Sequence, residues 1–177
     1  MTDHNATVES FKGLSETSPS ILHINTHGYA ETRKSAVNLP ALKDNFRPMD
    51  LTGIVLSNGN DGWLRGTADR HEGIMLASEI ARMDLSKTDI VFLSCCYSGE
   101  GIVKADGIYG LQRALLLAGA KTIIMSLWAV NEYAGLLFAK TFYSSYLNNK
   151  DRHQAFKEAR MAVREQYIDD QLHNKAT

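Results

Sequence analysis

Hydrophobic and polar positions along the chain form blocks that predict strands and helices in turn. Four short runs are apolar, rich in β-branched residues and bounded by turn or polar residues, which is typical of interior strands. They are Ser20–Asn25, Gly53–Ser57, Asp89–Ser94 and Thr122–Leu127. Because each run is apolar throughout, we expect a mostly parallel sheet with helices on both faces, an α/β sandwich.

Apolar residues at helical spacing occupy the segments between and after these runs. In the last segment Phe156, Ala159, Val163 and Tyr167 recur at spacings of three and four, which predicts an apolar stripe against a core. Gly119 is expected to close the third helix. The predicted helices are Val8–Leu14, Leu76–Met83, Tyr109–Ala118, Tyr133–Leu147 and Asp151–Tyr167.

The charges of the chain are balanced and evenly spread. There are 19 Lys and Arg against 20 Asp and Glu in 177 residues, without a long run of like charge. We therefore expect no nucleic-acid or membrane partner, and a protein, peptide or small-molecule partner instead. The amino end lacks the pattern of a signal peptide, and Lys121 interrupts the most apolar region, Ala114–Val130. These features predict a soluble protein with a single domain over residues 1–177.

The two cysteines of the chain, Cys95 and Cys96, are neighbours at the end of the third predicted strand. Neighbouring Cα atoms lie about 3.8 Å apart, below the span of about 4.4 to 6.8 Å that a disulfide usually has. We therefore expect free thiols in a cytoplasmic protein, and we expect no secreted fold held together by disulfides.

Polar and reactive residues follow two of the predicted strands. The first strand ends in Asn25-Thr26-His27-Gly28, and the third ends in Ser94-Cys95-Cys96. A parallel sheet brings these ends to one edge, which is where ligands bind in open α/β sheets. A nearby imidazolium lowers the pKa of a thiol from about 8.5 toward about 4 to 7 and makes it a nucleophile. The pattern predicts a Cys–His dyad, with the polar segments Tyr29–Asp50 and Asn58–Gly73 as rim loops.

Backbone N–H groups next to the dyad could bind the oxyanion that forms when a carbonyl is attacked. Gly28 has no Cβ and can approach a substrate closely, and the N–H of Cys96 is the natural second donor. Successive side chains on a strand point to opposite faces, so only one cysteine of the pair can face His27. Cys96 lies nearer the end of the strand and is the predicted nucleophile, and Cys95 is predicted to be a small core residue.

These residues resemble a known family. The sequence has THG on one strand, LSxCxxG on another, and then GxYGLQRALLLAGAKTIIMSLW. This order is similar to CHAT domains, caspase-like (clan CD) cysteine peptidases related to separases, gingipains and metacaspases, over about Ala6 to Tyr167. The resemblance implies a caspase-like three-layer α/β sandwich that hydrolyses peptide bonds without a cofactor. It assigns the catalytic pair to His27 and Cys96, and the oxyanion donors to Gly28 and Cys96.

The sequence departs from the family pattern at several positions. Cys95 replaces an Ala, Tyr97-Ser98 replace Glu-Thr, and Asn131-Glu132 stand where the family commonly has two Asp. In several relatives an acid in the primary pocket selects Arg or Lys before the scissile bond. The resemblance makes Glu132 the first candidate for this role and Asp106 the second.

Trp128 is a further candidate for the substrate pocket, although partial burial in the core would explain it equally well. The resemblance also implies that the chain lacks the family's first strand and helix. A helical-repeat region or a regulatory protein is the expected partner that supplies this part, alongside a protein or peptide substrate.

A simpler interpretation of the whole domain stays open. The domain could be a binding or scaffold module of a larger signalling protein that keeps the fold without the chemistry.

His23 lies four residues before His27, about 13 Å away at about 3.3 Å per residue. We interpret it as a hydrogen-bonded core histidine, and this distance excludes a zinc site that uses both.

Overall fold

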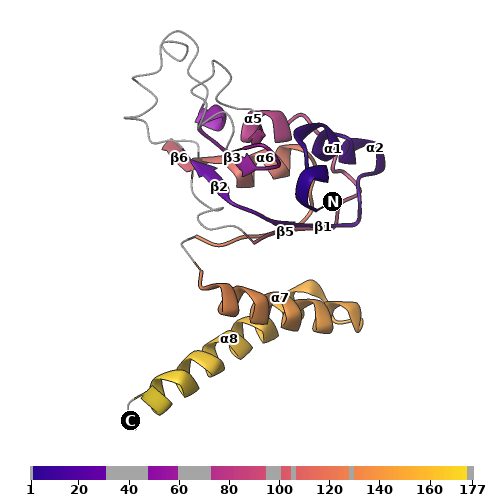
Figure 1. Cartoon of the computed structure of the whole chain (residues 1–177). Helices are drawn as coiled ribbons and strands as arrows, with labels where there is room; N and C mark the ends of the chain where they lie inside the picture. Colours follow the sequence, from indigo (N-terminus) through magenta and orange to yellow (C-terminus); the bar gives the residue numbers. More distant parts are fainter. Residues whose placement is uncertain are drawn as a thin grey trace. The chain divides into compact units, whose positions relative to one another are not determined.

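The computed structural model describes residues 2–30, 48–59, 73–94, 101–104, 107–127 and 130–174. The chain divides into two compact units, Met1–Ala129 and Val130–Thr177, which are described separately below. The first unit is mixed α and β, and the second is helical (Figure 1). The expected single domain therefore stays a prediction.

The helices of the described residues are short in the first unit and long in the second. In chain order they are η1 (Asp3–Asn5), α1 (Val8–Lys12), α2 (Leu14–Thr17), η3 (Pro48–Leu51), α5 (Ala77–Ile80), α6 (Leu111–Leu117), α7 (Glu132–Leu147) and α8 (Arg152–Asn174). The strands are β1 (Ile21–Asn25), β2 (Gly28–Ala30), β3 (Thr52–Val55), β4 (Ile74–Leu76), β5 (Ile90–Ser94), β6 (Gly101–Lys104), β7 (Gly107–Gly110) and β8 (Ile123–Ile124).

The first unit contains a three-stranded parallel sheet in the order β1-β5-β8. β5 pairs with β1 along its whole length, with Ile21 opposite Ile90 and Asn25 opposite Ser94. On its other side it pairs with β8, with Phe92 opposite Ile124. These three strands confirm three of the four predicted apolar runs. β5 lies between the other two strands, and its residues 90–93 are all buried, which is typical of a strand covered on both faces.

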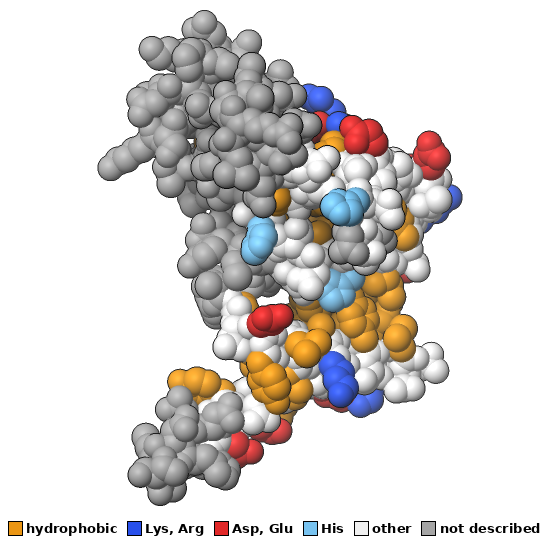
Figure 2. All heavy atoms as spheres, in the orientation of Figure 1, with side chains coloured by type: hydrophobic (Ala, Val, Ile, Leu, Met, Phe, Trp, Pro, Cys, Tyr) orange, Lys and Arg blue, Asp and Glu red, His pale blue; other side chains and the backbone are white. Residues whose placement is uncertain are grey.

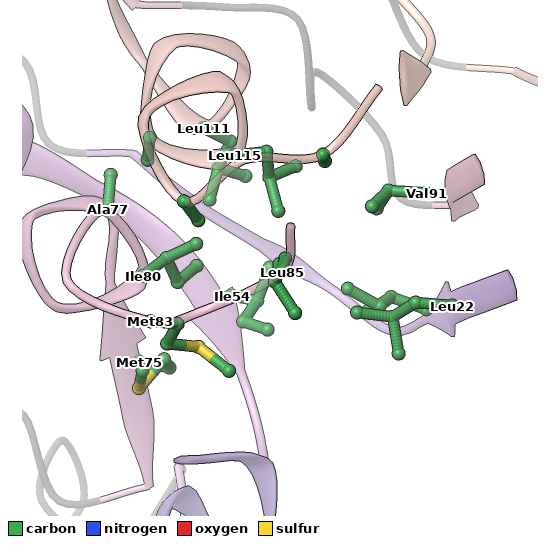
Figure 3. Packing of buried hydrophobic residues seen from close by; sticks show 14 of the residues in the cluster. Leu22, Ile54, Met75, Ala77, Ile80, Met83, Leu85, Val91, Leu111 and Leu115 are labelled. Carbon is green, nitrogen blue, oxygen red and sulfur yellow. The ribbon is translucent and has the colours of Figure 1, made fainter. Parts of the chain in front are cut away.

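One face of this sheet carries the hydrophobic core. Leu22 and Ile24 of β1 share that face with Val91 and Leu93 of β5, and all four are buried. They pack in one cluster with side chains from three helices and β3 and β4 (Figure 3). Figure 1 draws α1, α5 and α6 on the same side of β1 and β5. The predicted α/β class, with a parallel sheet flanked by helices, is thereby confirmed.

The ends of the first unit's helices follow from local chemistry. Thr7 caps α1: its Oγ1 accepts a hydrogen bond from the N–H of Ser10 at 3.2 Å, and Ser10 Oγ accepts one from the N–H of Thr7 at 3.0 Å. Gly119 follows α6 with φ of +101°, a left-handed conformation that favours glycine. The prediction that Gly119 closes this helix is correct. The helix itself begins two residues later than predicted, because Tyr109 belongs to β7.

The predicted run Gly53–Ser57 is a strand of a different kind. β3 lies between β2 and β4 and is antiparallel to both, in a sheet of its own within the described residues. The run was predicted to lie in the parallel sheet because it is apolar throughout. Thr52, Gly53 and Ile54 are indeed buried. Burial alone does not report strand direction, so the sequence could not distinguish the two arrangements. The predicted helix Leu76–Met83 is also shorter, since α5 spans only Ala77–Ile80.

A hairpin of β6 and β7 comes after β5 in the chain and was not predicted. The two strands pair antiparallel, with Lys104 opposite Gly107 across a connection of residues 105–106. Asp106 and Gly107 are residue types that favour turns, so the sequence held a signal for this connection.

The second unit is a helical hairpin in which α7 and α8 pack against each other. Asn131 caps α7, and its Oδ1 accepts a hydrogen bond from the N–H of Tyr133 at 2.9 Å. Asp151 does the same for α8, accepting from the N–H of His153 at 2.8 Å. The Phe138 and Phe156 rings meet edge to face, with 5.3 Å between their centroids. Both predicted helices are present, and α8 continues past Tyr167 to Asn174.

The buried stripe of α8 differs from the predicted one. Ala159 is fully buried as predicted, and Ala155 is fully buried as well, whereas Phe156 is 39% and Tyr167 64% exposed. Phe156 contacts the Phe138 ring of α7 while part of it stays exposed. Apolar side chains are visible on the surface of α7 and α8 in Figure 2, and Leu136 of α7 is among the exposed ones. Among the described residues, no helix combines the length and apolar character that crossing a membrane requires.

Glu158 links α7, α8 and the turn between them. Its carboxylate accepts hydrogen bonds from Lys150 Nζ at 2.8 Å and from Gln154 Nε2 at 3.0 Å, and also from the hydroxyl of Ser145. The bond from Lys150 contributes most, and together these donors lower the pKa of Glu158 from 4.5 to about 2. A group whose pKa falls on folding stabilises the folded state above its unfolded pKa.

We predict that Glu158→Gln lowers the melting temperature at neutral pH, and that this difference shrinks as the pH falls from about 4.5 to about 2. The reason is that acid protonates the wild-type carboxylate over this range and removes the same charge as the substitution. Thermal unfolding followed by circular dichroism at a series of pH values measures it. Glu165→Gln, at an exposed position of the same helix, is the control and should show no such dependence. A Glu158→Gln penalty that stays constant with pH would contradict the prediction.

Candidate active site

The carboxyl ends of β1 and β5 finish at the same level of the parallel sheet. Asn25 is opposite Ser94, and each is the last residue of its strand. Adjacent strands lie about 4.8 Å apart. His27 follows Asn25 by two residues, and Cys96 follows Ser94 by two residues. Cys95 and Cys96 lie outside the described residues, so the dyad itself stays a prediction.

The backbone on both sides of His27 is held by β3. The N–H of Val55 donates a hydrogen bond to the carbonyl of His27 at 2.9 Å, and the hydroxyl of Thr26 donates one to the carbonyl of Val55. The next residue, Gly28, is opposite Ile54 in the antiparallel sheet. His27 thus lies where the chain leaves the parallel sheet and joins the antiparallel one. Its side chain is exposed, as a residue that meets a substrate must be.

The direction of the Gly28 N–H follows from the same hydrogen bond. The described residues contain no cis peptide, so the His27–Gly28 peptide is trans. In a trans peptide the C=O and the N–H point in opposite directions. Because the carbonyl of His27 points to β3, the N–H of Gly28 points away from β3. Gly28 is exposed, so this N–H is directed to a surface that a ligand can reach.

The remaining predicted site residues are only partly described. Glu132 is the first residue of α7 and is exposed, in the turn capped by Asn131. Trp128 lies outside the described residues, as does Asp106, which belongs to the connection between β6 and β7. Most of the predicted rim loops, residues 31–47 and 60–72, also lie outside them. The pocket assignments therefore stay predictions.

His23 differs from the core histidine that was predicted. Its Nε2 shares a hydrogen bond with Ser94 Oγ at 3.0 Å, which confirms that it is hydrogen-bonded. Its side chain is nevertheless exposed in part, because β1 turns this face away from the core cluster. The ring packs against Phe92, with 4.6 Å between the ring centroids. This partial burial lowers the pKa of His23 below its usual value of 6.5.

The structure thus defines an α/β domain in which two parallel strand tips, one bearing a histidine and one leading to a cysteine, meet at one edge. The family model described as CHAT domain matches residues 1–176. The chain belongs to the CHAT family, whose domains are caspase-like. This confirms the resemblance drawn from the THG and LSxCxxG motifs.

Two curated relatives carry the name tetratricopeptide repeat protein 28. The mouse protein is 32% identical over 161 residues, which is 90% of this chain and 6% of the relative. The human protein is 35% identical over 92 residues, which is 52% of this chain and 4% of the relative. The chain therefore corresponds to a small part of these proteins, and their name describes repeats.

Gly53 of β3 supports the site because β3 holds the backbone of His27. A Cβ at this position would lie 2.4 Å from the carbonyl oxygen of Met75 and 3.1 Å from the Cα of Leu76, both in the backbone of β4. We predict that Gly53→Ala lowers the free energy of unfolding by about 1 to 3 kcal/mol, because the two strands must separate. Urea unfolding of the full chain measures the change.

Gly13→Ala is the matched control for this prediction. Gly13 has φ of −59° and a Cβ there would meet nothing closer than 3.4 Å, so alanine should be neutral or stabilise by up to about 1 kcal/mol. Equal unfolding free energies for the two alanine variants would show that β3 and β4 do not pack as tightly as described.

Proposed function

We propose that the chain is a cysteine endopeptidase that cleaves peptide bonds in protein substrates through a His27–Cys96 dyad. The observation that carries the proposal is the register of β1 and β5. Asn25 and Ser94 are opposite each other, and the two candidate residues follow them at the same distance along the chain. Membership of the caspase-like CHAT family supports the same assignment of roles.

The core-facing positions of β5 support the choice between the two cysteines. Val91 and Leu93 face the core, whereas Phe92 and Ser94 lie on the face of His23. Side chains alternate along a strand, so continuing β5 would place Cys95 on the core side with Val91 and Leu93, and Cys96 on the side of Ser94. On β1 the core side is taken by Leu22 and Ile24, so His23 and Asn25 lie on the opposite side, and His27 continues their alternation. The alternation thus favours Cys96 as the thiol on the same side as the imidazole.

The proposed reaction runs through an acyl-enzyme. The His27 imidazole takes the proton of the Cys96 thiol, and the thiolate attacks the carbonyl carbon of the scissile bond. The N–H groups of Gly28 and Cys96 stabilise the oxyanion, a contribution of about 3 to 4 kcal/mol for a single donor in comparable sites. His27 then protonates the leaving amine, and water releases the acyl group and restores the thiol. The outward direction of the Gly28 N–H supports its part in this scheme.

Specificity for a basic residue before the scissile bond is proposed for the same site. Glu132 would supply the carboxylate, with Asp106 as the second candidate and Trp128 as a wall of the pocket. We place the protein in the cytoplasm, because adjacent free cysteines suit a reducing compartment. The names of the relatives suggest that helical repeats act with the domain, by presenting substrates or regulating it.

A binding or scaffold role without catalysis is the second candidate function. The observation that favours it is that both curated relatives are named for their repeats and not for an activity. A caspase-like module without chemistry would keep the sheet and its core and bind a partner protein at the same edge. The test of the dyad separates this candidate from the peptidase.

We predict that Cys96→Ala reduces cleavage of peptide substrates to background, because it removes the nucleophile. His27→Gln should reduce the rate by about 10²- to 10⁴-fold, the usual contribution of a general base. Turnover of a peptide library, together with labelling by a peptide electrophile that reacts with thiols, measures both effects.

Cys95→Ala is the matched control, since it removes the neighbouring thiol and should leave most of the activity and labelling. If Cys95→Ala is the inactive variant, the assignment of the nucleophile is wrong. If neither variant changes labelling and wild type cleaves nothing in the library, the peptidase proposal is wrong and the scaffold function is favoured.

The specificity of the proposed peptidase is tested with the same library. We predict a preference for Arg or Lys before the cleaved bond, because a carboxylate in the pocket would pair with a basic side chain. Glu132→Gln should weaken that preference by about tenfold or more while cleavage after other residues is retained. A wild-type preference for Leu or Met would exclude Glu132 from the pocket, and Glu165→Gln controls for loss of an exposed charge.

A further inference from the structure

The tip of β5 is tied to β1 by a side-chain contact that the proposed chemistry does not use. His23 Nε2 and Ser94 Oγ share a hydrogen bond of 3.0 Å across the two strands. Ser94 is the last residue of β5 and directly precedes the cysteine pair. The contact therefore lies next to the segment whose position matters most for the dyad.

The contact is diagonal across the parallel pair. His23 is opposite Phe92, and Ser94 is opposite Asn25, so the imidazole reaches one pleat forward along β5. The ring of Phe92 lies under it, with centroids 4.6 Å apart and planes tilted by 39°. The phenyl ring fills the space on one side of the imidazole and limits its rotation. The imidazole is thus held in the orientation that reaches the Ser94 hydroxyl.

The protonation state of His23 is consistent with a fixed contact. Partial burial lowers the pKa of His23 from its usual value of 6.5, which favours the neutral form of the ring. A neutral imidazole can either donate to or accept from a serine hydroxyl. It adds no charge beside the cysteines, so it would leave the pairing of a thiolate with His27 undisturbed.

We propose that His23 is a positioning residue that fixes the tip of β5 through Ser94 and thereby orients Cys96 toward His27. The inference rests on the proposed function for its second part, the orientation of the thiol. Its first part, the anchoring of the strand tip, concerns the described residues alone. The strand ladder by itself holds the backbone up to Ser94, and the imidazole adds a constraint at the point where the ladder ends.

The test uses the full chain with Cys95→Ala as background, which leaves Cys96 as the single thiol. The rate of alkylation by iodoacetamide, followed by mass spectrometry across pH, reports the apparent pKa of that thiol. We expect His23→Phe, which keeps an aromatic ring on Phe92 and removes the hydrogen bond, to raise this pKa toward about 8.5. The alkylation rate below the pKa should fall by about tenfold for each unit of rise.

Conservative and partner variants distinguish the hydrogen bond from packing. His23→Gln retains an amide that can reach Ser94 and should restore most of the wild-type profile. Ser94→Ala should reproduce the His23→Phe profile, because each substitution removes the same hydrogen bond. The double variant should therefore show no larger change in the thiol pKa than either single variant. Two results would contradict the proposal that His23 orients Cys96. One is a shift of the thiol pKa in the double variant that equals the sum of the two single shifts, and the other is a His23→Phe profile identical to that of the Cys95→Ala background.

Hydrogen exchange measures the anchoring itself. In His23→Phe the amides at the end of β5 should exchange about two- to tenfold faster, the factor that one net hydrogen bond is worth, and those of β3 should be unchanged. Unchanged exchange at the end of β5 would overturn the anchoring. If Cys96 in the Cys95→Ala background already titrates near about 8.5, its thiol is not activated and the proposed peptidase is wrong. The proposed orientation of Cys96 is then wrong as well. The anchoring of the end of β5 is in that case tested by hydrogen exchange alone.

Discussion

The hydrogen bonds that pair β1 with β5 in parallel are the constraint on which the candidate site depends. They set Ile21 opposite Ile90 and Asn25 opposite Ser94, and so they finish the two strands at one level. A slip of one residue would turn every side chain of one strand to the other face. The apolar pairs Leu22 with Val91 and Ile24 with Leu93 prevent that slip, because all four must face the same core. The packing of the core thereby determines which residues end the two strands at this edge.

A second constraint acts at the residue after β1. The chain leaves the parallel sheet at Asn25 and enters the antiparallel sheet at Gly28, and β3 holds the residues between them through Thr26 and the carbonyl of His27. One hydrogen bond, from the N–H of Val55, serves two purposes. It fixes the backbone of the candidate base and, through the planar peptide, directs the next N–H outward. The backbone of the candidate base, His27, and the N–H of Gly28, the candidate oxyanion donor, are thus oriented by the same strand.

Family membership and activity have different support in this protein. The CHAT family model covers residues 1–176, and the α/β architecture agrees with it. The curated relatives are proteins of which this chain covers only 6% and 4%, and they are named for their repeats. The peptidase function therefore rests on the chain's own residues: the histidine, the glycine after it and the cysteine that follows the neighbouring strand. The same strand tips would serve a partner-binding role if the thiol were not activated.

Local sequence pattern was enough to predict the elements with strong periodicity and the residue types of the candidate site. Three strands of the parallel sheet, the long helices α7 and α8 and the pair of strand tips follow from local pattern, because burial and turn chemistry act on neighbouring residues. Asp106 and Gly107, residue types that favour turns, also mark in the sequence the place where β6 connects to β7. Three features follow from tertiary structure alone: β3 is antiparallel, Ala155 is buried while Tyr167 is exposed, and His23 reaches Ser94. Strand direction, helix rotation and a cross-strand hydrogen bond depend on which distant segment becomes the neighbour, and local pattern carries no information about that choice.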